Sequence, residues 1–331
     1  MSVQRASVES VTDWVSDATM APSMHNAQPW RFRYRPAAGV LQLRMDKTRS
    51  MPRSDSTNRG MHLSCGAALF NLRVAAARAG WSAPVTLLPD PAEPVLLAIV
   101  EFAEHAENDD ISALYPAIGR RRSSREPFAD EPVPGALLDS LSGAARSEGA
   151  NLSVLGEWQV EAVLDAVAEA QQDESLSPEA REELARWTAS AAEGDDGIPV
   201  YAFGPHRYDG RAPVRDFALG RPVRQRRSAV FESHPCLAVL ATARDRPQDW
   251  LLSGQAMERV LLQAALDGLS TSLNSQALER SELRWLLRDP RSGTTAACPQ
   301  MLLRLGYGPV VPSTPRRAVS DVLDVEDESS V

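Results

Sequence analysis

The alternation of apolar and polar residues in the first third of the chain predicts two helices and four strands. Apolar residues recur at helical spacing between Val8 and Ala18, and this helix is expected to end near Met20. Apolar and polar residues then alternate on both sides of a turn at Pro36–Gly39, which is typical of a β-hairpin. The later predicted elements are strands Trp30–Arg35 and Val40–Asp46, the helix Gly66–Ala79 capped by Ser64 and closed by Gly80, and strands Val85–Leu88 and Val95–Phe102.

Helical and strand patterns continue through the rest of the chain, except in one long segment without periodicity. Helices are expected at Gly135–Arg146, Glu157–Ala192 with a break near Ser177–Pro178, Leu252–Asp267 and Leu278–Leu287. Strands are expected at Leu152–Leu155, Leu237–Ala243 and Met301–Gly306, and an acidic linker at His105–Asp110. Gly194–Ser228 has no clear periodicity, and a loop of that length is usually functional, often as a lid, or disordered. We call it the lid segment, and the whole pattern predicts an α+β fold.

One helical pattern occurs twice. GAALFNLRVAAARAG at Gly66–Gly80 aligns without gaps with GQAMERVLLQAALDG at Gly254–Gly268, with glycine at both ends of each. Two buried helices can converge on small residues through packing alone. Strands of similar type follow each copy, and this repeated order favours a duplication.

Composition narrows the possible functions. The 331 residues are 43% hydrophobic and 24% charged, as in a soluble globular protein of one large domain or two ordinary ones. The net charge of −9 argues against a general nucleic-acid binder. We see no signal sequence or membrane span. Three cysteines without CxxC spacing indicate buried thiols in a reduced cytoplasmic protein, and five scattered histidines give no metal-binding pattern.

The stretch Ala21–Phe32, APSMHNAQPWRF, combines two prolines with several uncharged polar side chains and an aromatic pair. The prolines exclude a regular helix, so the segment is expected to be a rigid loop. Hydrogen-bonding groups beside an apolar wall suit a flat heterocycle with polar edges. A loop that only caps the preceding helix would use the same residues, and both interpretations stay open on chemistry alone. His25 is interpreted as loop packing.

A second polar stretch, GRRRSSREPF at Gly119–Phe128, is rich in arginine. Guanidinium groups present forked donors that match phosphate oxygens, and serine hydroxyls add further donors. Such a run alone is more often a solvated surface or a salt-bridge site. Two other fragments carry polar side chains. LNSQ at Leu273–Gln276 follows the helical pattern Gly254–Gly268, and PRRAVSDVL at Pro315–Leu323 follows the end of the last predicted strand.

These four fragments resemble motifs of the nitroreductase superfamily of FMN-dependent enzymes. The loop resembles the motif that lies against the FMN ring, and the arginine run resembles the RRSxRxF signature that holds the FMN phosphate, with Phe128 displaced by one position. Where family members often have an acidic residue and a glycine near flavin N5, this chain has Ser275 and Gln276. The resemblance implies these cofactor-binding residues: Ser23, Met24, Asn26, Gln28, Arg121, Arg122, Ser123, Arg125, Asn274, Ser275, Gln276, Arg316 and Arg317.

The order of the motifs is unusual for that family. Each motif occurs once, and the ring motif precedes the arginine motif. This arrangement resembles the Acg-like branch, whose members are tandem nitroreductase folds. The resemblance implies two degenerate halves, residues 1–110 and 111–331, that form an internal pseudo-dimer with one FMN at their junction. The chain is then expected to act as a monomer.

The resemblance leads to one expected activity and one alternative. An FMN oxidoreductase would take hydride from NAD(P)H at N5 and reduce a nitroaromatic, a quinone or a similar acceptor. Alternatively, the protein would sequester or store FMN beneath the lid segment with little turnover. A structural protein that has lost the cofactor ranks third.

Overall fold

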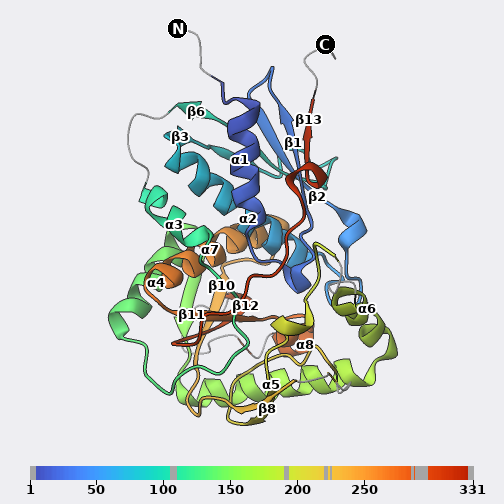
Figure 1. The fold of residues 1–331 in the computed structure, drawn as a ribbon, viewed down its shortest axis with the longest axis vertical. Coiled ribbons are helices and arrows are strands. Elements are labelled where there is room, and N and C mark those ends of the chain that lie inside the picture. The colour runs from blue at the N-terminus through green and yellow to red at the C-terminus, as the bar shows by residue number, and fades with distance from the viewer. Residues whose placement is uncertain are drawn as a thin grey trace.

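Two sheets lie on either side of a central pair of long helices in the computed structural model of the chain (Figure 1). The paired helices are α2 (Arg59–Arg78) and α7 (Pro247–Leu266). In Figure 1 the sheet with β1 and β2 is drawn above this pair, and the sheet with β10 and β12 below it. The structure describes residues 5–104, 110–189, 194–219, 223, 226–284, 287 and 297–326.

The first sheet contains the predicted hairpin. Its spatial order is β13 (Leu323–Val325), β1 (Trp30–Arg35), β2 (Val40–Met45), β5 (Leu96–Glu101) and β4 (Val85–Leu87). All neighbours are antiparallel except β13, which joins β1 in parallel through Phe32 opposite Leu323. Every second residue of β1 is buried, and this alternation fixes which face meets the core.

The second sheet is antiparallel throughout. Its spatial order is β7 (Asn151–Val154), β10 (Cys236–Thr242), β12 (Cys298–Gly306) and β11 (Ser270–Asn274). Two small sheets complete the strands: β3 (Trp81–Ser82) with β6 (Ala103–Glu104), and β8 (His206–Asp209) with β9 (Ser228–Val230).

Four strands of the first sheet have counterparts in the second. The spatial order β1-β2-β5-β4 corresponds to β7-β10-β12-β11, with antiparallel pairing throughout. Helix α1 (Val8–Thr19) precedes β1 and packs on α2, while α4 (Gly135–Ser147) precedes β7 and packs on α7. The long helices also occupy corresponding places in the chain, between the second and third strands of each set.

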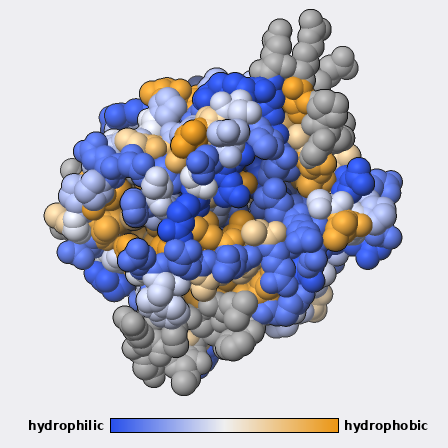
Figure 2. Space-filling model, turned by 90° about the horizontal axis from the view of Figure 1, so that it is seen from below, coloured by the Kyte–Doolittle hydropathy of each residue, from blue (hydrophilic) through white to orange (hydrophobic). Residues whose placement is uncertain are grey.

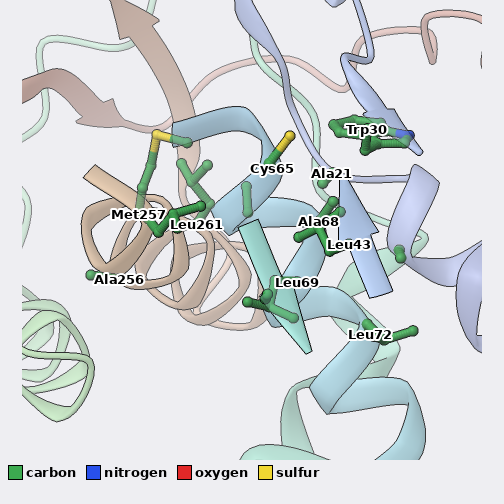
Figure 3. Packing of buried hydrophobic residues seen from close by; sticks show 14 of the residues in the cluster. Ala21, Trp30, Leu43, Cys65, Ala68, Leu69, Leu72, Ala256, Met257 and Leu261 are labelled. Carbon is green, nitrogen blue, oxygen red and sulfur yellow. The ribbon is translucent and has the colours of Figure 1, made fainter. Parts of the chain in front are cut away.

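The two long helices approach each other at a pair of glycines. A Cβ added to Gly66 would meet the carbonyl oxygen of Leu251 and lie 3.0 Å from the Cα of Gly254. A Cβ added to Gly254 would meet the carbonyl oxygen of Leu63 and lie 2.9 Å from the Cα of Gly66. The absence of side chains therefore lets the backbones touch. Figure 3 shows the apolar residues on either side of this contact, including Leu69 on α2.

The outer face of the second sheet is covered by α5 (Glu157–Leu176), which buries Val163 and Val167 against Leu237 and Leu302. Helix α6 (Pro178–Ala189) follows after the predicted break at Ser177, whose backbone is extended. The remaining α-helices are short: α3 (Tyr115–Ile118) and α8 (Ser281–Arg284). The described part of the lid segment then runs over one end of the second sheet and contains β8.

Several predicted boundaries are wrong. Helix α2 begins at Arg59 rather than Gly66, because the Asp55 carboxylate accepts the N–H groups of Gly60 and Met61 at 2.8 and 2.9 Å and starts the helix early. Ser64 is therefore not a cap, and its hydroxyl donates to the carbonyl of Gly60.

Helix α7 begins at Pro247 rather than at Leu252, since proline is well suited to a first helical turn. In the described part of the predicted helix Leu278–Leu287, the α-helical residues are those of α8. Residues 105–109, 190–192, 220–222, 224, 225, 285 and 286 of the predicted segments lie outside the described residues. Cys65 is buried as expected, but Cys236 and Cys298 are only partly buried.

The surface seen from below in Figure 2 is mainly hydrophilic, with separate hydrophobic patches. Within the part of the chain that the structure describes, we find no helix both long enough and apolar enough to cross a membrane.

Candidate functional site

The loop after α1 has an unusual backbone. His25, Asn26 and Gln28 have φ angles of 49°, 56° and 50°, in the left-handed region that residues with a Cβ rarely adopt. Each such residue costs on the order of 1 kcal/mol. The Ser23 hydroxyl helps to hold the turn by accepting the N–H of Gln28 at 2.9 Å. Strained backbone that side chains hold in place is typical of ligand-binding loops.

A first cavity opens beside this loop and contains about 940 Å³ of space, part of it open to solvent. Its walls come from the loop, the start of α2, the lid segment and the end of β11. The lining includes Ser23, Met24, His25, Asp55, Arg59, Ser123, Arg125, Arg215, Phe217, Met257, Asn274, Ser275 and Glu279. Aromatic, apolar and hydrogen-bonding groups in one concave wall suit a flat ring with polar edges.

A second cavity of about 810 Å³, including open space, lies on the other side of the loop. It shares four lining residues with the first: Pro22, Ser23, Ser123 and Arg125. Its other lining residues include Asn26, Arg121, Arg122, Glu126, Tyr201, Thr314 and Arg316. The two cavities therefore adjoin at Ser23 and Arg125.

The second cavity is strongly basic. Burial lowers the pKa of Arg316 to about 9, and the neighbouring Arg121 lowers it further in the same direction. Burial also lowers the pKa of Arg121. Both guanidinium groups remain charged near neutral pH, and Arg122 and Arg125 also line the wall. Four guanidinium groups around one cavity suit a phosphate or a similar anion.

Arg316 also fixes the shape of this cavity. Its guanidinium donates to the carbonyls of Thr19 and Met20 at the end of α1, at 2.8 and 3.1 Å, and to the Asn26 side chain at 3.0 Å. The C-terminal segment is thereby tied to the loop. Because helix C-termini carry partial negative charge, a cation is stabilised there.

The first cavity contains an ion-paired cluster contributed by the lid segment. Arg215 pairs with Glu279 at 2.9 Å and also with Glu174 of α5. Burial raises the pKa of Glu279, while Arg215 opposes this shift. The ring of Phe217 lies 5.7 Å from the Arg215 guanidinium and 4.6 Å from that of Arg125, so both cations face its π system.

His25 lies edge-on to Phe217, with ring centroids 5.8 Å apart. Burial lowers the pKa of His25 well below its usual value, and the charges of Arg215 and Arg125 act in the same direction. The imidazole is therefore neutral near pH 7. Its Nε2 is buried and forms no hydrogen bond with any described residue.

Comparison with known proteins assigns the family. No protein-family model matches the chain. The Mycobacterium tuberculosis H37Rv protein named "Putative NAD(P)H nitroreductase Rv3131" is 32% identical over 326 residues, which are 97% of this chain and 92% of the relative. The chain belongs to the nitroreductase superfamily. It is also similar to "Putative NAD(P)H nitroreductase acg" of the same organism, at 29% identity over 93% of each chain.

Solved structures of nitroreductases resemble parts of the chain. The FMN and NADPH-dependent nitroreductase NfnB from sphigopyxis sp. strain HMH aligns with 65% of this chain and 99% of its own, at 19% identity and a TM-score of 0.41. A nitroreductase with bound FMN from Bacteroides fragilis aligns with 62% of this chain and 95% of its own, at 14% identity and a TM-score of 0.38.

Most residues that match nitroreductase motifs line the two cavities. Ser23, Met24, Ser123, Arg125, Asn274 and Ser275 line the first, and Ser23, Asn26, Arg121, Arg122, Ser123, Arg125 and Arg316 line the second. Of the two tail arginines, Arg316 faces a cavity. Arg317 instead donates to the carbonyl of Asp321 and lies 4.0 Å from the Asp46 carboxylate.

Two further expected residues line neither cavity. The Gln28 amide donates to the carbonyl of Asp195 at 2.8 Å, and its oxygen accepts the Arg317 N–H at 2.9 Å. The Gln276 amide donates to Glu174 at 2.9 Å. Gln28 therefore connects the loop to the lid segment and to the C-terminal tail, and Gln276 connects α5 to the segment after β11. The sequence resemblance had assigned both side chains to cofactor binding.

The sequence prediction missed several cavity residues. Glu279 places a carboxylate in the first cavity, four positions after Ser275. Arg215 and Phe217 lie in a segment without periodicity, so no pattern pointed to them. Arg59 links α2 to the second sheet by donating to the carbonyl of Gln300 at 2.6 Å, a contact between residues far apart in sequence.

Proposed function

We propose that the protein is an FMN-binding oxidoreductase that takes hydride from NAD(P)H and passes electrons to a nitroaromatic, a quinone or a similar acceptor. One observation carries this proposal: a cavity with aromatic and polar walls joins a cavity lined by arginines at Ser23 and Arg125. The combined space suits a molecule with a flat ring at one end and a phosphate at the other. FMN is such a molecule, and the relatives carry nitroreductase names.

In this proposal Arg121, Arg122 and Arg316 hold the phosphate. Arg121 and Arg122 line the second cavity, and their guanidinium groups would form charge-assisted hydrogen bonds with a phosphate there. Ser123, at the junction of the cavities, would contact the ribityl chain.

The ring would lie in the first cavity, against Met24 and the end of β11. FMN, when bound, supplies hydride transfer. Arg125 would add positive charge there, which would stabilise negative charge that develops during reduction. Phe217 would cover one side of the ring.

We further propose that residues 1–110 and 111–331 are two degenerate copies that form an internal pseudo-dimer. The common strand order of the two sheets supports this. So does the reciprocity of the glycine contact, in which Gly66 meets Leu251 and Gly254 meets Leu63, as in a two-fold symmetric interface. The tail returns to the first sheet through β13, so the second copy contributes a strand to the first.

FMN sequestration is the second candidate, and the lid segment favours it. Asn26 and Gly197 exchange two hydrogen bonds, at 2.9 and 3.2 Å. Arg49 pairs with Asp196 at 2.7 Å. Together with the Arg215 ion pairs, these contacts hold residues 195–217 against the cavities, and a cofactor beneath them would be shielded.

Anaerobic reduction distinguishes the two candidates. We expect the purified protein to show a flavin absorbance spectrum, which should bleach within seconds after NADPH is added. Bound flavin that stays oxidised would favour sequestration. Failure to bind FMN during reconstitution would contradict both candidates.

Loosening the lid segment should accelerate FMN release. Asp196→Asn removes the partly buried ion pair with Arg49 and should raise the dissociation rate by about fivefold, measured by stopped-flow fluorescence as flavin leaves the protein. The neighbouring Asp195 is exposed, and Asp195→Asn is the matched control that should leave the rate unchanged. Equal rates for both variants would show that the Arg49–Asp196 pair does not hold the lid segment closed.

A further inference from the structure

A fully buried carboxylate lies beneath the second cavity. Glu258 is on α7 and is 0% exposed, and its Oε1 lies 3.5 Å from the Nε of Arg121. Neither carboxylate oxygen accepts a hydrogen bond of ordinary geometry from any described residue. Buried ionised carboxylates nearly always have such partners, because an unpaired one loses its hydration without replacement. Glu258 therefore needs a physical explanation.

The groups around Glu258 are cationic or neutral. Arg121 approaches from the segment after α3, Arg316 from the C-terminal tail and Asn71 from α2. Arg122 lowers the pKa of both arginines, and Tyr201 raises the pKa of Arg316. Among the described residues that line the second cavity, Glu126 is the acidic one, and it pairs with Arg227. Glu258 is thus the acidic partner of Arg121 on the side away from the cavity.

We infer that Glu258 is a built-in counter-ion of the phosphate cavity, which shares Arg121 and Arg316 with the cofactor phosphate and takes up a proton when that phosphate binds. The inference rests on the proposed FMN function and adds to it a dependence of FMN affinity on pH. In the unliganded protein the carboxylate balances the two arginines. In the complex the phosphate takes over that role, and a second negative charge close to it becomes unfavourable.

The protonation equilibrium of Glu258 supports this role. Burial raises its pKa to about 7, although Arg121 and Arg316 act in the opposite direction. A phosphate near the same arginines adds negative charge and raises the pKa further. Between the two pKa values the complex holds the proton and the unliganded protein does not. FMN affinity must then fall as the pH rises through this range, because binding requires proton uptake.

Calorimetry on the unmodified protein tests the inference directly. FMN is titrated near pH 8 in two buffers of different ionisation enthalpy, and the difference in heat gives the protons taken up. If the phosphate raises the pKa of Glu258 by roughly one unit, uptake should be roughly 0.4 proton per FMN. Riboflavin lacks the phosphate, so its binding should take up none. The phosphate of FMN is already doubly ionised at this pH, since its second pKa is about 6.

The pH dependence of affinity gives a second readout. For the unmodified protein the FMN dissociation constant should rise about fivefold between about pH 7 and about pH 9. Glu258→Gln removes the titration and should abolish this rise. Glu148→Gln is the matched control, because Glu148 is also buried but pairs with Arg73 and Arg259 away from both cavities. It should retain the wild-type pH dependence.

The outcomes separate the inference from the proposed function. FMN binding without proton uptake, or with the same pH dependence in Glu258→Gln, would overturn the counter-ion role and leave FMN binding intact. Failure of the unmodified protein to bind FMN would overturn both. Since the calorimetric test needs no variant, a folding defect in Glu258→Gln would not prevent a decision.

Discussion

Replacement of Arg316 by alanine should raise the FMN dissociation constant by about 100-fold. Arg316 lines the second cavity, and its guanidinium is held toward the loop by the carbonyls of Thr19 and Met20. A charge-assisted interaction with the phosphate would be lost, while the other arginines that line this cavity remain. The measurement is equilibrium titration by flavin fluorescence.

Two comparisons make this result specific. Riboflavin affinity should change by less than about threefold, because the lost contact is to the phosphate. Arg317→Ala is the matched control from the adjacent position, where the side chain faces Asp46 and not a cavity. Equal losses for FMN and riboflavin would mean that Arg316 acts only by shaping the loop, and a larger loss in Arg317→Ala would contradict the assignment.

Gly254→Ala should lower the free energy of unfolding by about 3 kcal/mol. In a helix interior this substitution normally stabilises by about 1 kcal/mol. Here the new Cβ would meet the carbonyl oxygen of Leu63 and lie 2.9 Å from the Cα of Gly66. Both obstacles are backbone atoms and cannot rotate away, so α2 and α7 must move apart and lose packing along their whole interface. Urea denaturation followed by circular dichroism measures the change.

Gly143→Ala provides the matched control. Gly143 lies within α4, and the nearest atom to its added Cβ is the end of the Arg146 side chain at 3.8 Å. This variant should be more stable than the unmodified protein by about 0.5–1 kcal/mol. If Gly254→Ala were stabilised to the same extent, the close approach of the two long helices would be refuted.

The elements that sequence pattern predicted well are those that depend on local chain chemistry. The β1–β2 hairpin follows from alternation on both sides of a short turn, and the break at Ser177 follows from the proline after it. The starts of both long helices were predicted too late. In their first turns the apolar periodicity is interrupted by polar residues, and the Asp55 side chain caps the start of α2.

The candidate site was likewise predicted only in part from the sequence. The loop and the arginine run were recognised as motifs, and their residues line adjoining cavities. Gln28 and Gln276 matched the motifs equally well but point to structural partners. Motif matching assigns a residue type to a position, whereas the direction of its side chain depends on neighbours that are distant in sequence, such as Asp195 and Glu174.

By itself, the sequence determined the α+β class, most elements and the superfamily resemblance, because these are carried by periodicity and by contiguous motifs. Only the tertiary structure decided the rest. It joined β13 to the first sheet, brought Arg215 to Glu279, and buried Glu258 against Arg121. Each of these contacts joins residues more than 50 positions apart. These contacts change the charge and burial of their residues only when the chain is folded, so the pattern of residues along the sequence does not predict them.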